Sequence, residues 1–298
     1  MAFEAVERMV HYLEPMIIMA ISGIREFPYN MPYILHMLLT FNWRDLLLTS
    51  GICGPLVLFV TLADILFVQR NPRLLFKPKE LQDLWFARFW LFLGPIISYN
   101  ERDHSPVPEL VHSSTGVVLE LGPGSGEQLY CYDIEKITHI YGVEPCLALI
   151  PALKAKIKEL GLQDKYTIVP HVVEDLGKLM EYGVEEGGVD TVLSIRVLCS
   201  VRNVEETVRG VYRMLKPGGK IVFFEHIRSR YLFPRLLEEV YNIPWSYMIA
   251  NCHLNRPTDK ILVRGLEWAE VDMIEPVGQK SFAVVPYVYG TLVKAGKA

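Results

Sequence analysis

The sequence Val117–Gly126, V-V-L-E-L-G-P-G-S-G, predicts a buried strand that runs directly into a glycine-rich loop. Glycines occupy alternate positions in that loop, at Gly122, Gly124 and Gly126. Because glycine has no Cβ and adopts positive φ at little cost, such a loop brings the backbone very close to a ligand. Glu120 lies at the carboxyl end of the strand, where open α/β sheets bind their ligands. By itself, the stretch also fits a plain tight turn between a strand and a helix.

The spacing of the glycines argues against a dinucleotide-binding loop. That loop has the pattern G-x-G-x-x-G, and the helix that follows it points its N-terminus at a pyrophosphate. Here Glu127 stands where the third glycine of that pattern would fall, and its carboxylate would repel the pyrophosphate. A nicotinamide oxidoreductase is therefore disfavoured. An acidic residue before the loop instead favours a cationic ligand with an ammonium and a sulfonium group, and the stretch resembles the glycine loop of class I S-adenosylmethionine (SAM) methyltransferases.

Composition sets broad limits on the class of protein. The chain has 298 residues, enough for one large or two small domains. Hydrophobic residues make up 51% and mean hydropathy is +0.22, with the apolar excess concentrated early in the chain. The net charge of −4 and the lack of a run rich in Lys and Arg give no indication of nucleic-acid binding. The five cysteines are irregularly spaced without a metal-binding pattern, which favours a reducing compartment and predicts no metal site.

The first 100 residues predict a helical, membrane-associated region. Residues 46–68 are almost continuously apolar, and about 20 such residues suffice to span a hydrocarbon core. A buried pair of short helices that breaks at Gly54-Pro55 is the alternative. Basic residues follow this segment and place its C-terminal side in the cytosol. Residues 79–93 predict an amphipathic helix, either interfacial or core-facing.

A second region follows a predicted linker at residues 105–108, and we place the boundary at residue 100, with a catalytic domain over 101–298. Strands and helices alternate there, which indicates an α/β fold with a doubly wound, mostly parallel sheet. Asn203 with Glu206 predicts a capping box at a helix start. The predicted strands are 117–121, 137–143, 166–173, 189–195 and 220–224, with two later β-rich segments at 271–277 and 282–293, and the main helices are 147–160 and 203–215.

Acidic residues at the ends of the second and third strands are candidate contacts to an adenosine group. Glu144 follows the glycine loop by about 20 residues and is placed to accept hydrogen bonds from two ribose hydroxyls. A solvated loop carboxylate is the plainer interpretation. Glu174 or Asp175, which end the third strand, could meet the adenine amino group, and Val173 could add a backbone contact.

The segment 194–200 ends the fourth strand, where the sulfonium of SAM would lie, and it contributes Leu198 as a candidate cofactor contact. Arg196 is unusual there, because a cation near a cationic sulfur is unfavourable unless it is paired. Its possible partners are Glu120 and the methionyl carboxylate. Cys199 fits a small packing residue better than a nucleophile, because methyl transfer from SAM is a direct displacement.

Three residues are candidates for catalysis. His226, at the end of the fifth strand, is the first candidate for a general base, and Glu225 is expected to orient it. A structural histidine bonded to a backbone carbonyl is the alternative. His253, on a later loop, is a second candidate base.

Several segments together resemble one family, the membrane-associated alkyl-thiol methyltransferases of the endoplasmic reticulum and lipid droplets. They are V-L-C-S-V-R-N (197–203), M-L-K-P-G-G (214–219), F-F-E-H (223–226), C-H-L-N-R (252–256) and P-Y-V-Y-G (286–290). The resemblance implies a seven-stranded sheet with an antiparallel terminal hairpin, SAM as cofactor and a cytosolic catalytic domain on one of these membranes. The chain departs from the family in its long N-terminal region and in Arg196, where the family has a small polar residue.

The sequence therefore predicts a membrane-anchored SAM-dependent methyltransferase that acts on a small lipophilic acceptor, with a thiol as the first expectation. Methylation of oxygen, nitrogen or carbon on a secondary metabolite or a quinone-type lipid keeps the same chemistry with another acceptor. A membrane tether that binds SAM without catalysis is the alternative from another class.

Overall fold

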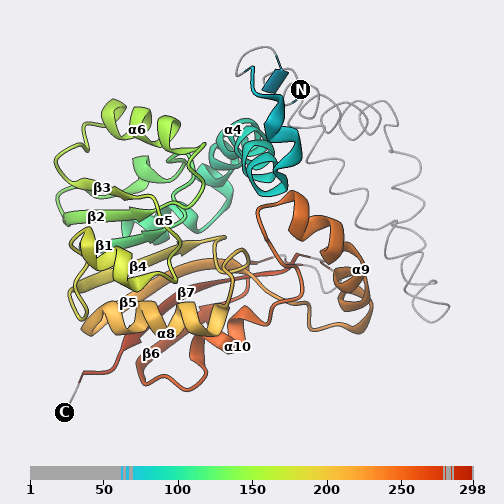
Figure 1. Cartoon of the computed structure of the whole chain (residues 1–298). Coiled ribbons are helices and arrows are strands. Elements are labelled where there is room, and N and C mark those ends of the chain that lie inside the picture. The colour runs from blue at the N-terminus through green and yellow to red at the C-terminus, as the bar shows by residue number, and fades with distance from the viewer. Residues whose placement is uncertain are drawn as a thin grey trace.

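A computed structural model describes residues 62, 65–66, 70–277, 279, 283 and 285–296. Its centre is a seven-stranded sheet in the order β3-β2-β1-β4-β5-β7-β6 (Figure 1). The strands are β1 (Gly116–Leu121), β2 (Ile137–Val143), β3 (Tyr166–Val169), β4 (Val189–Ile195), β5 (Leu215–His226), β6 (Trp268–Ile274) and β7 (Tyr287–Lys294).

The first five strands are parallel to one another, and β7 runs antiparallel to both β5 and β6. This confirms the predicted α/β fold with its mixed seven-stranded sheet and antiparallel terminal hairpin. The parallel strands are rich in Val, Ile and Leu because helices bury them on both faces. Their carboxyl ends all reach one edge of the sheet, and the predicted ligand-binding residues lie along that edge.

Helices cover both faces of the sheet (Figure 1). The helical elements of the described residues are η2 (Pro72–Phe76), α4 (Pro78–His104), α5 (Val107–His112), η3 (Leu129–Cys131), α6 (Ile150–Glu159), α7 (Leu176–Glu181), α8 (Val204–Met214), α9 (Leu232–Met248) and α10 (Thr258–Val263). Asn203 caps α8 as predicted, since its side chain accepts a hydrogen bond from the Glu206 N–H at 3.2 Å.

Alternate residues of each strand enter two separate cores, as the period of two in a strand requires. On one face, Leu119 and Val192 pack with the apolar side of α8 and with α7 and α10. On the other face, Val118 and Leu193 pack with α5, α6 and η3. The sheet is thus the middle of three layers, and its edge stays available to loops.

The chain between the glycine loop and β2 forms turns and the short 3₁₀ helix η3. Two strands differ from the sequence prediction. Strand β3 ends at Val169, short of the predicted residue 173, because Pro170 cannot donate to the ladder. Strand β5 begins at Leu215, which pairs with Val189, so the predicted break at 216–219 lies inside the strand.

The predicted apolar segment 46–68 lies outside the described residues, apart from Leu62, Ile65 and Leu66. Among the helices that the structure describes, none is both long enough and apolar enough to cross a bilayer. The helix predicted over 79–93 is present in α4, which continues through Pro95 and past residue 100 to His104. One side of α4 is buried, with Ala87 and Ser98 among its buried residues, so this helix packs against the rest of the protein.

Candidate functional site

The glycine loop connects the end of β1 to the edge of the sheet, and it needs glycine for a geometric reason. Gly122, Gly124 and Gly126 have φ values of +53°, +62° and +88°, a region that side chains with a Cβ rarely adopt. A Cβ at Gly124 would lie 2.6 Å from the indole nitrogen of Trp90. The loop is therefore a closely packed turn of bare backbone, and the predicted close approach to a ligand stays a prediction.

Glu144 holds this loop against the end of β2. Its Oε2 accepts a hydrogen bond from the Gly124 N–H at 2.9 Å, and its Oε1 accepts one from the Cys146 N–H at 2.8 Å. The side chain is buried, and burial, together with the nearby Glu127 carboxylate, raises its pKa to about 7. Each oxygen keeps lone-pair capacity for a further donor, so the predicted contact to ribose hydroxyls remains compatible with this geometry.

Glu120 is a second buried carboxylate beside the loop. The Tyr166 hydroxyl donates to its Oε2 at 2.7 Å. Burial raises the pKa of Glu120 to about 7, although the Tyr166 hydrogen bond opposes that rise. Two carboxylates that are easily neutralised therefore flank the glycine loop, and a cationic ligand would favour their ionised forms.

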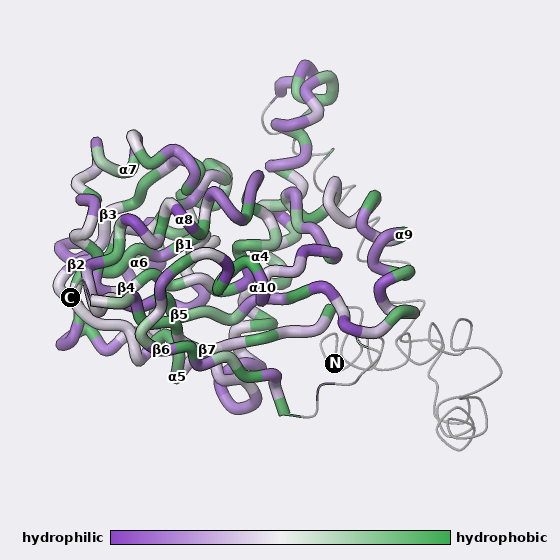
Figure 2. The backbone as a smooth tube through the Cα atoms, turned by 90° about the horizontal axis from the view of Figure 1, so that it is seen from below, coloured by the Kyte–Doolittle hydropathy of each residue, from purple (hydrophilic) through white to green (hydrophobic). Residues whose placement is uncertain are grey.

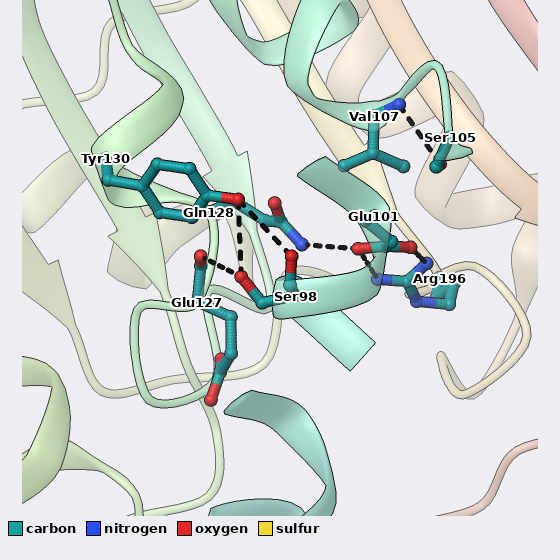
Figure 3. A network of polar contacts seen from close by, with 8 residues as sticks. All are labelled: Ser98, Glu101, Ser105, Val107, Glu127, Gln128, Tyr130 and Arg196. Carbon is teal, nitrogen blue, oxygen red and sulfur yellow. Dashed lines mark hydrogen bonds and ion pairs between the residues drawn. The ribbon is translucent and has the colours of Figure 1, made fainter. Parts of the chain in front are cut away.

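Helix α4 lies over the glycine loop and contacts it through polar side chains (Figure 3). The Trp90 indole N–H donates to Glu127 Oε2 at 3.1 Å. The Ser98 hydroxyl donates to the backbone oxygen of Glu127 at 3.0 Å. Glu127 also accepts a hydrogen bond from the Ser125 N–H at 3.2 Å. Glu127 thus links the loop to α4, a role that its sequence position did not indicate.

The partner of Arg196 is Glu101 of α4, whereas the sequence suggested Glu120 or a ligand carboxylate. Arg196 donates through both terminal nitrogens to the two Glu101 oxygens, with Nη2 at 3.1 Å from Oε2. Gln128 donates to the same Oε2 at 3.0 Å (Figure 3). The charge of Arg196 is therefore neutralised by Glu101 of α4. The need for an anionic partner was readable from the sequence, but its identity was not.

Two acidic residues that follow β3 hold backbone hydrogen bonds. Glu174 accepts from the Arg202 N–H at 2.6 Å, and Asp175 caps α7 by accepting from the Lys178 N–H at 3.2 Å. Val173 is buried in the core beneath them. The predicted adenine contacts of these three residues remain predictions.

Glu225 fixes the turn that follows β4, and the expectation that it orients His226 through a hydrogen bond finds no support in these contacts. Its Oε1 accepts from the Ser194 hydroxyl at 2.7 Å, from the Val197 N–H at 2.9 Å and from the Leu198 N–H at 3.1 Å. This completely buried carboxylate thereby shapes the segment 194–200. The Leu198 side chain is buried in the core, so any cofactor contact that it makes would come from its backbone.

His226 lies beside two cysteines that the sequence gave no reason to group. Its Nε2 is 3.1 Å from Cys252 Sγ, and the ligand atoms of Cys199, His226 and Cys252 all lie within 4.8 Å of one another. All three residues are buried. Burial alone would lower the pKa of His226, but the Cys199 sulfur and the Glu225 carboxylate raise it above its usual value.

His253 is held between two asparagines. The Asn242 amide contacts its Nδ1 at 3.1 Å, and Asn251 Oδ1 lies 3.2 Å from its Nε2. Burial, with help from Arg256, lowers its pKa. Because both ring nitrogens have partners, His253 is less available than His226 to exchange a proton with an acceptor.

Comparison with known proteins agrees with this geometry. Residues 119–223 match the model of a methyltransferase domain. The chain is 33% identical over 225 residues to thiol S-methyltransferase TMT1A of Homo sapiens, covering 70% of this chain and 86% of that protein. It is 27% identical over 198 residues to thiol S-methyltransferase TMT1B of Rattus norvegicus, covering 64% and 76%. Among solved structures, the [4+2]-cyclase SpnF shares the fold with a TM-score of 0.50 and 13% identity, over 66% of this chain and 82% of that one.

Replacing Gly124 tests the role of the loop. In Gly124→Ala, the new Cβ would meet Trp90 at a position with φ of +62°, and the left-handed conformation costs about 1–2 kcal/mol for a residue other than glycine. We expect affinity for S-adenosylhomocysteine, measured by calorimetry, to fall about tenfold or more. Gly161→Ala is the matched control, since Gly161 has φ of +68° with open space around it. Equal affinity in both variants would remove the loop from the binding site.

The pKa of Glu144 predicts a pH dependence of ligand binding. A carboxylate with a pKa of about 7 gains roughly tenfold in ionised fraction between about pH 6 and pH 8, and the ionised form is the stronger acceptor for ribose hydroxyls. We expect affinity for S-adenosylhomocysteine to rise through this range. In Glu144→Gln the rise should be reduced and the affinity low throughout.

The same pKa predicts an opposite trend for the free protein. Because the folded pKa lies above the ordinary value of 4.5, the native state holds a proton that the unfolded chain has lost, and stability falls as the pH rises from about 4.5 to about 7. Urea denaturation of the unaltered protein and of Glu144→Gln over this pH range measures the fall in the free energy of unfolding. The fall should be smaller in the variant. An unaltered slope in the variant would contradict the assignment.

Proposed function

The chain belongs to the family of SAM-dependent methyltransferases that includes the thiol S-methyltransferases, and from this membership we propose that it methylates the sulfur of a small lipophilic thiol. The observation that carries the proposal is the similarity to the human enzyme over most of both chains. The buried group of Cys199, His226 and Cys252 at the sheet edge supports it, since polarisable sulfur and imidazole groups suit a sulfur acceptor.

The reaction needs placement more than covalent help from the protein. A thiolate attacks the methyl carbon in line with the bond to the sulfonium sulfur, and holding the two in that arrangement lowers the barrier substantially. With a thiol pKa of about 8.5, a fraction is already ionised near neutral pH. The protein must therefore bind the donor, exclude water and stabilise the thiolate form of the acceptor.

The glycine loop and the two carboxylates beside it would hold SAM. Glu144 would accept from the ribose hydroxyls, and Glu120 would meet the positively charged end of the donor. The cover that α4 forms over the loop would keep water from the cofactor. SAM itself supplies the activated methyl group.

An exposed apolar stripe on α9 supports a lipophilic acceptor. The stripe is Leu232, Leu236, Val240, Ile243 and Tyr247, with exposed fractions of 65%, 52%, 67%, 76% and 57%. These positions recur every three or four residues and therefore share one side of the helix. Figure 2 shows α9 at one side of the described residues, away from the strands.

We propose that the α9 stripe rests on a lipid bilayer. The apolar segment 46–68 of the same chain favours the same environment, because its length matches the hydrocarbon core. Helix α9 leads into the turn that holds Cys252 and His253, so a thiol that dissolves in the bilayer would enter from this side. The cytosolic surface of the endoplasmic reticulum or of lipid droplets is the location that fits this proposal.

The acceptor is tested with a methyl-transfer assay on the full chain in lipid, using labelled SAM. We expect turnover with alkyl thiols at least about thirtyfold above that with matched phenols and amines, since the thiolate is about that much more abundant than the phenolate near neutral pH. Gly124→Ala should lose most of this activity. Turnover of phenols or amines alone would replace the thiol with another acceptor, and binding of SAM with no turnover at all would favour a tether.

The membrane contact is tested with phosphatidylcholine vesicles. Because each charge would have to enter the interface with the apolar stripe, Leu236→Asp combined with Ile243→Asp should reduce the bound fraction at least about threefold in flotation experiments. Val277→Asp is the control, since Val277 is fully exposed outside α9. Identical flotation of the double variant and the control would exclude the stripe as the contact, and thermal unfolding checks that both variants fold.

A further inference from the structure

Three side chains from distant parts of the sequence form a compact group to which the proposed function assigns no step of the reaction. Cys199 lies in the turn after β4, His226 is the last residue of β5, and Cys252 lies in the turn after α9. Their ligand atoms lie within 4.8 Å of one another, and all three residues are buried. We propose that this group binds one Zn²⁺ ion whose fourth position receives the substrate thiol; the proposal rests on the proposed thiol methylation.

The spacing fits such an ion. Zinc binds sulfur at about 2.3 Å and imidazole nitrogen at about 2.0 Å in a tetrahedral arrangement. Ligand atoms around it therefore stand about 3.5 to 3.8 Å apart. The distance from His226 Nε2 to Cys252 Sγ is 3.1 Å, and no pair of the three ligand atoms is more than 4.8 Å apart. The distances that zinc requires lie between these two values.

The surroundings also favour coordination. The His226 Nε2 atom already faces the Cys252 sulfur at 3.1 Å, so it is the ring nitrogen that would bind the ion. The Nδ1 atom is buried without a hydrogen-bond partner in the part of the chain that the structure describes. Two thiolates neutralise the charge of the ion, which lowers the cost of burying it. The Arg256 guanidinium donates to the Leu198 oxygen at 2.9 Å, next to Cys199, and brings positive charge that would balance a third thiolate.

Three protein ligands and one open position are the arrangement of catalytic rather than structural zinc. A thiol R–SH that takes the open position loses its proton to solvent and stays as a metal-bound thiolate. Its sulfur then forms a bond to the methyl carbon of SAM while the bond from that carbon to the sulfonium sulfur breaks, and the electron pair remains on S-adenosylhomocysteine. The product thioether is neutral and a weak ligand, so it leaves. No oxidation or reduction occurs, and His226 acts as a ligand instead of a base.

Metal binding is tested without activity. The full chain as purified is analysed for bound Zn²⁺ by mass spectrometry. A second sample, reduced and treated with chelator, is titrated with Co²⁺ under anaerobic conditions. We expect one equivalent of metal and a thiolate-to-cobalt absorption band. Cys199→Ser, His226→Ala and Cys252→Ser should each weaken binding by at least about a hundredfold, because changes even in outer-shell partners cost about 10–100-fold.

Cys131→Ser is the matched control, since Cys131 is also buried but lies in η3, outside the group. It should bind metal like the unaltered protein. No metal in the reduced, folded protein, or equal binding by all variants, would overturn the proposal. A disulfide between Cys199 and Cys252 that forms under air while the reduced protein takes up no metal would overturn it as well.

Activity separates this proposal from the one on which it rests. Removal of metal should abolish thiol methylation, Zn²⁺ should restore it, and affinity for S-adenosylhomocysteine should stay unchanged in both states. Full thiol methylation by metal-free protein would overturn the zinc proposal and leave the proposed function standing. Metal bound by these three residues with no thiol methylated would remove the proposed function and, with it, the role of the open position.

Discussion

The hydrogen bond from the Gly124 N–H to the buried Glu144 carboxylate, at 2.9 Å, is the contact on which the site depends. It joins the loop after β1 to the end of β2, and it fixes a turn in which all three glycines adopt positive φ. Burial raises the pKa of Glu144 to about 7, and the hydrogen bond from Gly124 opposes that rise. The position of Glu144 beneath the loop therefore sets both the geometry of the loop and the ease with which this carboxylate gains or loses its proton.

Helix α4 completes this arrangement from outside the sheet. Trp90 and Ser98 bind Glu127 of the loop, while Glu101 binds Arg196 at the end of β4. A buried ion pair adds little net stability, but the loss of one partner leaves an uncompensated charge that costs about 3–5 kcal/mol. Helix α4 is therefore held to the methyltransferase fold by contacts in which the loss of either partner destabilises the protein.

The end of β4, where the acceptor would bind, depends on the Glu225 carboxylate, which accepts hydrogen bonds from the backbone. Glu225 collects three donors from residues 194, 197 and 198, and so holds the turn that presents Cys199 toward His226 and Cys252. Helix α9 ends four residues before Cys252, so under the membrane proposal its exposed stripe would give the acceptor an apolar approach. Cofactor and acceptor would therefore meet at the edge of the sheet from two differently built sides.

Local patterns determined most of the fold and the cofactor loop. Apolar runs and glycine spacing act over a few residues, so β1, β2 and β4, the cap at Asn203 and the importance of Gly124 and Glu144 were all readable from the sequence. Contacts between distant segments were not readable. Glu101 meets Arg196 across 95 positions, and Glu225 binds the backbone of the turn that follows β4. Cys199 and His226 meet because β4 and β5 are parallel neighbours that end at the same edge, and the turn after α9 adds Cys252. Sequence spacing carries the local conformation of the backbone, whereas the partners of buried charges and ligands depend on which strands become neighbours.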